Sequence, residues 1–81
     1  MAKITQTEII TAIEKALEVQ PGSVNETTHA RDIAAWDSLG HLNVLVALDR
    51  LLEGKVANIQ EMAEIDSVGK ILSVLSQRSL I

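Results

Sequence analysis

The spacing of apolar residues along this chain predicts helices. Between residues 5 and 19 apolar side chains recur at steps of three and four, which places them on one face of a helix. That face consists of Ile9, Ala12, Ile13, Ala16 and Leu17, and Glu8, Lys15 and Glu18 lie outside it. Thr5 and Glu8 have the spacing of a capping box at the helix start. Pro21-Gly22 is expected to end this first helix.

A polar segment follows the first helix. Residues 20–37 are rich in Thr, Asn, Gly and Ser, and their apolar residues show no helical period. We expect a long ordered loop, attached to the core by Val24, Ile33 and Trp36. Trp36 is the only aromatic residue of the chain, and its size favours an anchoring role against the core.

A second helix is predicted after the loop. It begins at Asp37 or Ser38, because both residue types are common helix caps. It runs to about Glu53 and stops at Gly54, a residue type that often terminates helices.

The last third of the chain is also helical in pattern. Residues 59–65 suit one or two turns, and Asp66 or Ser67 caps a last helix that continues through Leu75. The expected architecture is all-α, with three longer helices, one short helix and a long first loop. The length fits a single domain over residues 1–81.

The second helix carries more apolar residues than one buried face needs. One arc consists of Val44, Leu45, Leu48, Leu51 and Leu52. A second stripe, which we call the docking strip, consists of Leu39, Leu42 and Val46 and is bordered by Asn43, Asp49 and Arg50. An apolar strip with a polar rim is typical of a surface that binds a partner, whereas the central helix of a small bundle would bury both arcs. Periodicity alone leaves both interpretations open.

The composition of the chain argues against several classes of function. The net charge is −4 and Lys and Arg are scattered singly, which argues against nucleic-acid binding. The chain has no Cys and two His, so we expect no metal site. Its longest apolar run, from Val44 to Leu48, is too short for a membrane span, and no secretory signal is evident. We expect a cytoplasmic monomer, too small for a self-contained enzyme and without catalytic residues.

Ser38 is the candidate for chemical modification. The positive end of a helix dipole and the free amides of a helix start stabilise a phosphate placed there. A serine in this position is also an ordinary cap, and no nucleophile elbow or convincing catalytic triad surrounds it. His41, one turn on, is expected to be a partly exposed helix residue or to touch a group attached to Ser38. Gly40 is expected to leave room for a close partner or for a group attached to Ser38, or else to fray the helix start mildly.

The chain resembles the acyl carrier proteins, which are four-helix bundles, over nearly its whole length. The motifs that carry the resemblance are Asp37-Ser38-Leu39, Leu42, Val44-Leu45-Val46-Ala47-Leu48-Asp49 and the late Ser67-Val68-Gly69-Lys70-Ile71. Length, helix order, the long first loop and the acidic balance agree with that family. The resemblance therefore implies a single four-helix carrier domain.

The resemblance also implies a cofactor and partners. A phosphopantetheinyl transferase would attach 4′-phosphopantetheine to Ser38, between Asp37 and Leu39, and the arm would carry an acyl group as a thioester. The protein would be a carrier without catalytic activity. A loading ligase or transferase and enzymes that use the acyl group would bind the docking strip together with Asn43, Asp49 and Arg50.

This chain departs from the fatty-acid-synthesis members of that family. Gly40, Asn43 and Arg50 stand where those members typically carry acidic residues, which implies weaker steering toward basic partners. We therefore expect a specialised stand-alone carrier for a cell-surface polysaccharide, lipid or secondary-metabolite pathway. The alternatives are an aminoacyl or peptidyl carrier, and an unmodified helical adaptor in which Ser38 is only a helix cap.

Overall fold

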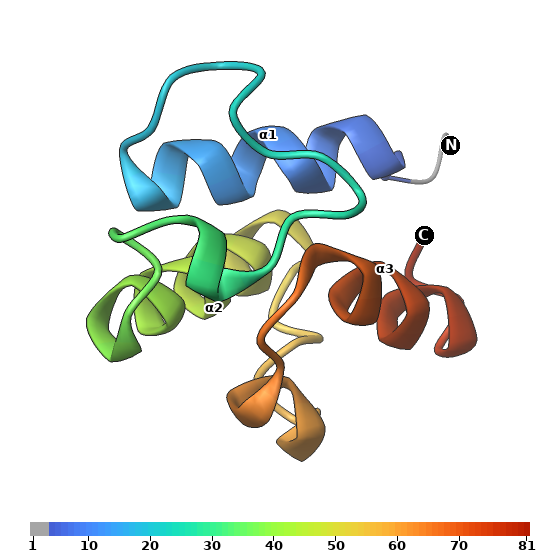
Figure 1. Ribbon diagram of the computed structural model, residues 1–81. Helices are drawn as coiled ribbons and strands as arrows, with labels where there is room; N and C mark the ends of the chain where they lie inside the picture. The colour runs from blue at the N-terminus through green and yellow to red at the C-terminus, as the bar shows by residue number, and fades with distance from the viewer. Residues whose placement is uncertain (1–3) are drawn as a thin grey trace.

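The protein is built from three α-helices and two short 3₁₀ segments, as seen in a computed structural model that describes residues 4–81 (Figure 1). In chain order the elements are α1 (Gln6–Leu17), η1 (Ala30–Asp32), α2 (Ser38–Leu51), η2 (Gln60–Glu64) and α3 (Val68–Gln77). The described part of the chain contains no strand beyond one isolated β-bridge. The all-α prediction is confirmed.

The expected short helix at residues 59–65 is a 3₁₀ segment, so a fourth α-helix is not clearly supported. Its apolar residues Ile59, Met62 and Ile65 are all buried and are spaced by three. A spacing of three matches the three residues per turn of a 3₁₀ helix, which places these side chains in one row. The apolar pattern therefore favours this tighter turn over an α-helix.

The first helix starts as predicted and ends earlier. The Glu8 amide donates to Thr5 Oγ1 at 3.1 Å, and the Thr5 amide donates to Glu8 Oε1 at 3.2 Å, which completes the capping box. Glu18 takes a left-handed conformation with φ of 56° and ends α1 after Leu17. The prediction that Pro21-Gly22 ends the helix is wrong, because the chain has already turned three residues before Pro21.

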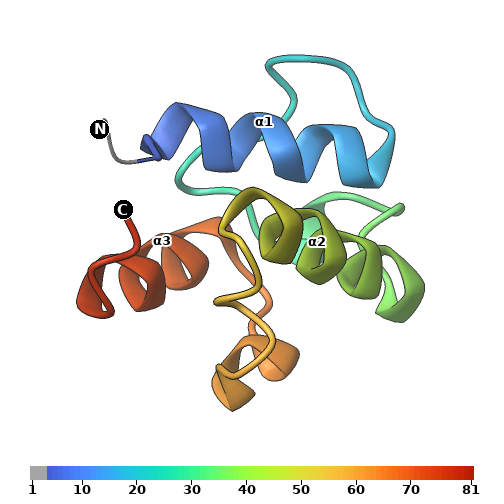
Figure 2. The same ribbon diagram turned by 180° about the vertical axis from the view of Figure 1, so that it is seen from behind.

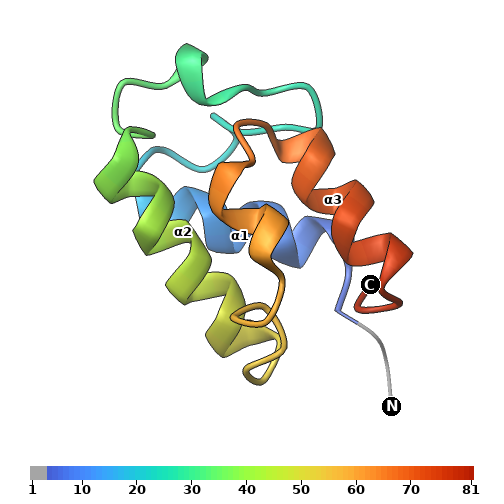
Figure 3. The ribbon, with the colours of Figure 1, turned by 90° about the horizontal axis from the view of Figure 1, so that it is seen from below.

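One aliphatic core joins the helices. Helix α1 lies along one side of α2 and α3, and η2 lies on the opposite side (Figures 1 and 2). Seen from below, η2 lies between α2 and α3 (Figure 3). The largest fully buried side chains come from all four of these elements: Ile9, Ile13, Val44, Leu48, Met62, Val68, Ile71 and Leu75. Burial of these side chains is the main force that holds the elements together.

The long loop between α1 and α2 is anchored at several points. Val24 and Trp36 are buried in the core and Ile33 is half-buried, as the apolar pattern predicts. Glu14, a buried carboxylate on α1, accepts the Gly22 amide at 2.7 Å and the Val24 amide at 3.2 Å. The sequence reasoning missed this anchor, although a carboxylate one residue after Ile13 on the apolar face was a usable signal.

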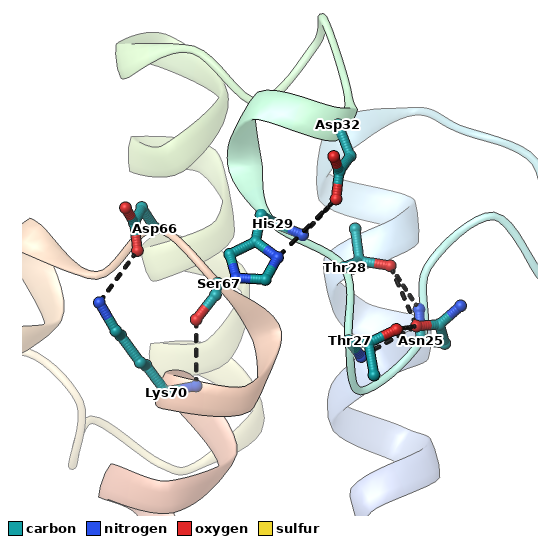
Figure 4. Close-up of polar contacts among 8 residues, drawn as sticks. All are labelled: Asn25, Thr27, Thr28, His29, Asp32, Asp66, Ser67 and Lys70. Atoms are coloured by element: carbon teal, nitrogen blue, oxygen red, sulfur yellow. Dashed lines mark hydrogen bonds and ion pairs between the residues drawn. The ribbon is translucent and has the colours of Figure 1, made fainter.

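The same loop is also tied to the start of α3. The Ala30 amide donates to the Asp66 carbonyl at 2.7 Å, and the Val68 amide donates to the Thr28 carbonyl at 3.0 Å, forming the β-bridge between His29 and Ser67. Figure 4 shows this junction, with Asn25 hydrogen-bonded to both Thr27 and Thr28 on the loop side. These bonds fix the loop across the end of the bundle where α2 begins.

Candidate functional site

Two neighbouring residues at the start of α2, Asp37 and Ser38, have different roles. Asp37 is the N-cap, and its Oδ1 accepts the Gly40 amide at 2.8 Å. Ser38 is the first residue of the helix and is exposed. The interpretation of Ser38 as the helix cap is therefore wrong, because the Asp37 carboxylate already performs that function.

Ser38 has an environment that suits an attached anionic group. Within residues 4–81 its hydroxyl makes no hydrogen bond, and the amides of Ser38 and Leu39 have no acceptor. Free amides at a helix start favour negative charge. The exposed hydroxyl, with two unused N–H donors beside it, fits a phosphodiester. The Asp37 carboxylate, one residue away, has the same sign of charge as a phosphodiester would have. Its hydrogen bond from the Gly40 amide directs one of its oxygens back toward the helix.

A hollow of about 260 Å³ lies beside Ser38. It is formed by segments distant in the sequence: Trp36, Ser38, His41, Ala63, Ile65 and Asp66 contribute to its walls. The sequence reasoning missed that Ala63, Ile65 and Asp66 approach Ser38. No local signal marks them, because only the packing of η2 against α2 brings residues more than twenty positions apart together.

Trp36 and His41 form the inner wall of this hollow. Trp36 is 5% exposed, which confirms its predicted anchoring role. Its Nε1–H donates to His41 Nδ1 at 3.0 Å, and His41 Nε2 lies 2.7 Å from the Met62 carbonyl oxygen. His41 is therefore half-buried and connects the loop, α2 and η2, a role that the helical pattern did not reveal.

Gly40 faces the loop, and the expectation that it leaves room for a partner or for a group attached to Ser38 is wrong. It is buried, and a Cβ there would overlap the Ala35 carbonyl oxygen and lie 3.1 Å from Leu17 Cδ2. The loop backbone approaches α2 so closely that no side chain fits. Gly40 is thus a packing residue and no longer indicates anything about partners.

The docking strip is exposed, which excludes the interpretation that a central helix buries both arcs of α2. Leu39, Leu42 and Val46 are 66%, 55% and 45% exposed, and they are the large apolar residues that the described surface exposes most. In the other arc, Val44, Leu48 and Leu52 are buried, whereas Leu45 and Leu51 are half-buried. Helix α2 therefore has one face toward the core and a separate apolar face toward solvent.

The polar rim of the strip is divided between solvent and the fold. Asn43 and Arg50 are exposed, and among residues 4–81 no carboxylate lies within ion-pair distance of Arg50. Asp49 is half-buried, and its Oδ1 accepts the amides of Val56 and Ala57 at 3.1 and 2.9 Å. Asp49 thus holds the segment after α2, and Arg50 is the free charge on the exposed face of α2.

An apolar hollow of about 330 Å³ adjoins the strip between α2 and η2. Its walls include the exposed residues Val46 and Arg50 and the less exposed residues Leu45, Val56, Ile59 and Met62. It therefore extends the exposed apolar surface of α2 toward η2.

Asp66, which lines the Ser38 hollow, forms an ion pair with Lys70. Lys70 Nζ lies 3.4 Å from Asp66 Oδ1, one helical turn away (Figure 4). The hydrogen bond and positive charge of Lys70 lower the pKa of the Asp66 carboxyl below its ordinary value. Asp66 therefore stays ionised to lower pH than an isolated aspartate.

Within residues 4–81 no three metal-binding side chains gather, and no helix combines the length and apolar character needed to cross a bilayer. Comparison of the chain with protein-family models, curated proteins and solved structures finds no match.

Proposed function

We propose that this protein is an acyl carrier whose attachment residue is Ser38. The observation that supports the proposal most is the exposed, unbonded Ser38 hydroxyl at the start of a helix whose cap is supplied by its neighbour, Asp37. A cap serine would be held by the fold, whereas this hydroxyl is free to react. The amides of Ser38 and Leu39 add a local preference for a phosphate.

The cofactor of such a carrier is 4′-phosphopantetheine, joined to Ser38 Oγ as a phosphodiester by a phosphopantetheinyl transferase. When bound, the arm supplies the terminal thiol that holds an acyl group as a thioester, a group that this cysteine-free chain lacks. The chain's own residues position the attachment point: Asp37 caps the helix, and Trp36 and Gly40 hold the preceding loop against it. The carrier itself performs no catalysis.

The partner surface of this carrier is the docking strip with Asn43 and Arg50. The strip begins at Leu39, next to Ser38, so an enzyme bound there has the attachment point within reach. Burial of exposed Leu and Val side chains is a common source of affinity at interfaces. Arg50 is the unpaired charge on this face. An acidic second helix suits basic partners, whereas the positive charge of Arg50 favours partners of a different kind. This supports a specialised member rather than a carrier of fatty acid synthesis.

Intact mass spectrometry tests the attachment directly. The full chain is incubated with coenzyme A, Mg²⁺ and a broad-specificity phosphopantetheinyl transferase, and we expect its mass to rise by one phosphopantetheinyl group. Ser38→Ala should abolish the increase. Ser73→Ala is the matched control, because Ser73 is an exposed serine on α3 and its loss should change nothing.

Two results would contradict the proposal: no mass increase in the natural chain, or an increase that persists in Ser38→Ala. The exposed docking strip would then favour the second candidate function, a helical adaptor that binds a protein through Leu39, Leu42 and Val46 without modification. A carrier of aminoacyl or peptidyl groups would give the same mass result, and analysis of the group bound in cells separates the two kinds of cargo.

A further inference from the structure

The imidazole of His41 uses both of its nitrogen atoms to join three segments of the fold. Nδ1 lies 3.0 Å from Trp36 Nε1, at the end of the long loop, and Nε2 lies 2.7 Å from the carbonyl oxygen of Met62 in η2. The two rings are nearly parallel, with an interplanar angle of 21° and centroids 6.1 Å apart. An in-plane hydrogen bond between the rings has this geometry.

These partners determine the protonation state of His41. An indole N–H only donates, so Nδ1 must accept, and a carbonyl oxygen only accepts, so Nε2 must carry the proton. The hydrogen-bond pattern therefore requires the neutral imidazole protonated on Nε2. A charged imidazolium has N–H groups at both positions and cannot accept the Trp36 hydrogen bond.

We propose that neutral His41 is a positioning residue for the Ser38 turn, and that protonation of its imidazole releases Trp36. Trp36 precedes Ser38 by two residues, and both line the same hollow. Loss of the bond from Trp36 frees the loop end while the bond to Met62 can persist. The consequence for Ser38 rests on the proposed carrier function, whereas the release of Trp36 does not.

Carboxylates lie near His41, but none of them can replace the lost bond from Trp36. Asp37 and Asp66 line the hollow that His41 lines, and none of the described carboxylates accepts a hydrogen bond from its ring. Because the bond from Nε2 to the Met62 carbonyl can persist, protonation should change the Trp36 contact and leave the domain folded. The charged and titratable groups on the segments that meet at His41 are Glu18, Glu26, His29, Arg31, Asp32 and Asp37 in the loop, Asp49 and Arg50 on α2, Glu61 with its partner Arg78 and Glu64 in η2, and Asp66 with its partner Lys70.

Trp36 provides a specific probe, because it is the only tryptophan in a chain without tyrosine or phenylalanine. Its fluorescence and its indole N–H resonance are followed on the unmodified full chain between about pH 8 and pH 5, the range in which histidines change charge. We expect a sigmoidal fluorescence change, with loss of the hydrogen-bonded shift of the indole proton and of its protection from exchange. Far-ultraviolet circular dichroism should stay constant.

Two variants assign the effect. His41→Gln keeps a donor and an acceptor but does not titrate, so its Trp36 signals should be flat over this pH range. His29→Gln removes the other imidazole of the chain and should retain the full wild-type curve. The ¹⁵N shifts of the His41 ring provide a second measurement on the wild-type protein at high pH, where we expect the proton on Nε2.

The proposal is overturned by a flat wild-type profile, by an unchanged curve in His41→Gln, or by a proton found on Nδ1. If His41→Gln fails to fold, the wild-type ring shifts and the His29→Gln curve still decide the matter. None of these measurements uses the transferase. Failure to label Ser38 would therefore contradict the carrier function alone, and a flat Trp36 profile would contradict the His41 switch alone.

Discussion

At the first turn of α2 the Asp37 carboxylate accepts a hydrogen bond from the Gly40 amide. The adjacent Ser38 hydroxyl makes no hydrogen bond within residues 4–81. Asp and Ser are both common N-caps, so only the observed hydrogen bonds show which of the two caps α2. A substitution at Ser38 therefore tests the proposed attachment without removing a hydrogen bond of the fold.

Replacement of each residue by alanine tests this division of roles. Asp37→Ala should lower the free energy of unfolding by about 1 kcal/mol, the usual value of a lost N-cap. Ser38→Ala should change it by less than about 0.5 kcal/mol, as expected for an exposed residue without a partner. Urea denaturation of the unmodified chain measures both. A larger loss in Ser38→Ala than in Asp37→Ala would contradict the assignment of the cap.

Gly40 gives a second prediction at this scale. Alanine is favoured over glycine within helices by about 1 kcal/mol, yet Gly40→Ala should destabilise the protein by about 1–3 kcal/mol, as overpacked substitutions do. The new Cβ would overlap the backbone oxygen of Ala35, which cannot rotate away.

Gly69→Ala is the matched control for Gly40→Ala in thermal or urea unfolding. Gly69 also lies in the first turn of a helix, and its nearest contact, the Glu26 carbonyl oxygen at 3.3 Å, requires only a small adjustment. A Gly40→Ala protein as stable as wild type would show that the loop does not press against α2.

At the scale of elements, each α-helix begins at a side-chain cap. Thr5, Asp37 and Ser67 each accept an amide of the first turn. Sequence patterns identified these starts because capping depends on residues only three positions apart. Helix ends were less accurate: α2 ends at Leu51 rather than near Glu53, since the left-handed turn begins at Glu53, before Gly54.

The start of α3 also has a pH-dependent component. Lys70 lowers the folded-state pKa of Asp66 below its ordinary value of 3.8. A lowered carboxyl pKa contributes stability that is present above the unfolded-state value and is lost as the pH falls through the folded-state value. Both side chains are largely exposed, so the effect on stability is small and sensitive to salt.

NMR titration of the Asp66 carboxyl carbon measures this pKa directly. In Lys70→Gln the midpoint should rise toward 3.8, because the hydrogen bond to a charged partner and its positive charge are both removed. Arg78→Gln is a suitable control, since Arg78 pairs with Glu61 and makes no ion pair with Asp66. An unchanged Asp66 midpoint in Lys70→Gln would exclude Lys70 as the cause.

At the scale of the whole molecule, α2 has one apolar face in the core and another in solvent. Its inner face completes the core, and its outer face presents the docking strip next to Ser38. The two faces have similar hydrophobicity, so substitutions of the same chemical kind should have opposite consequences on them.

Leu48→Ala and Leu42→Ala test this contrast. Leu48 is fully buried, and its truncation should cost about 2–5 kcal/mol, a large part of the stability of a domain of this size. Leu42 is 55% exposed, and its truncation should cost less than about 0.5 kcal/mol. If the strip binds the transferase, Leu42→Ala should also lower kcat/KM for modification of Ser38 about tenfold, which corresponds to about 1.4 kcal/mol.

Unfolding curves and the mass assay measure the two effects separately. Lys15→Ala, an exposed change on α1, serves as the control for both. Normal modification of a stable Leu42→Ala protein would remove the docking strip from the transferase interface. A loss of stability in Leu42→Ala equal to that in Leu48→Ala would show that both faces are buried.

The sequence by itself determined the all-α class, the helix starts, the burial of Val24 and Trp36 and the two apolar faces of α2, since these depend on spacings of a few residues. Only the tertiary structure decided that Gly40 packs against the Ala35 carbonyl, that His41 joins Trp36 to Met62, and that Ala63, Ile65 and Asp66 lie beside Ser38. It also decided which apolar arc of α2 meets solvent. These features arise where separate segments meet, and the local period of a sequence does not encode which segment packs against which.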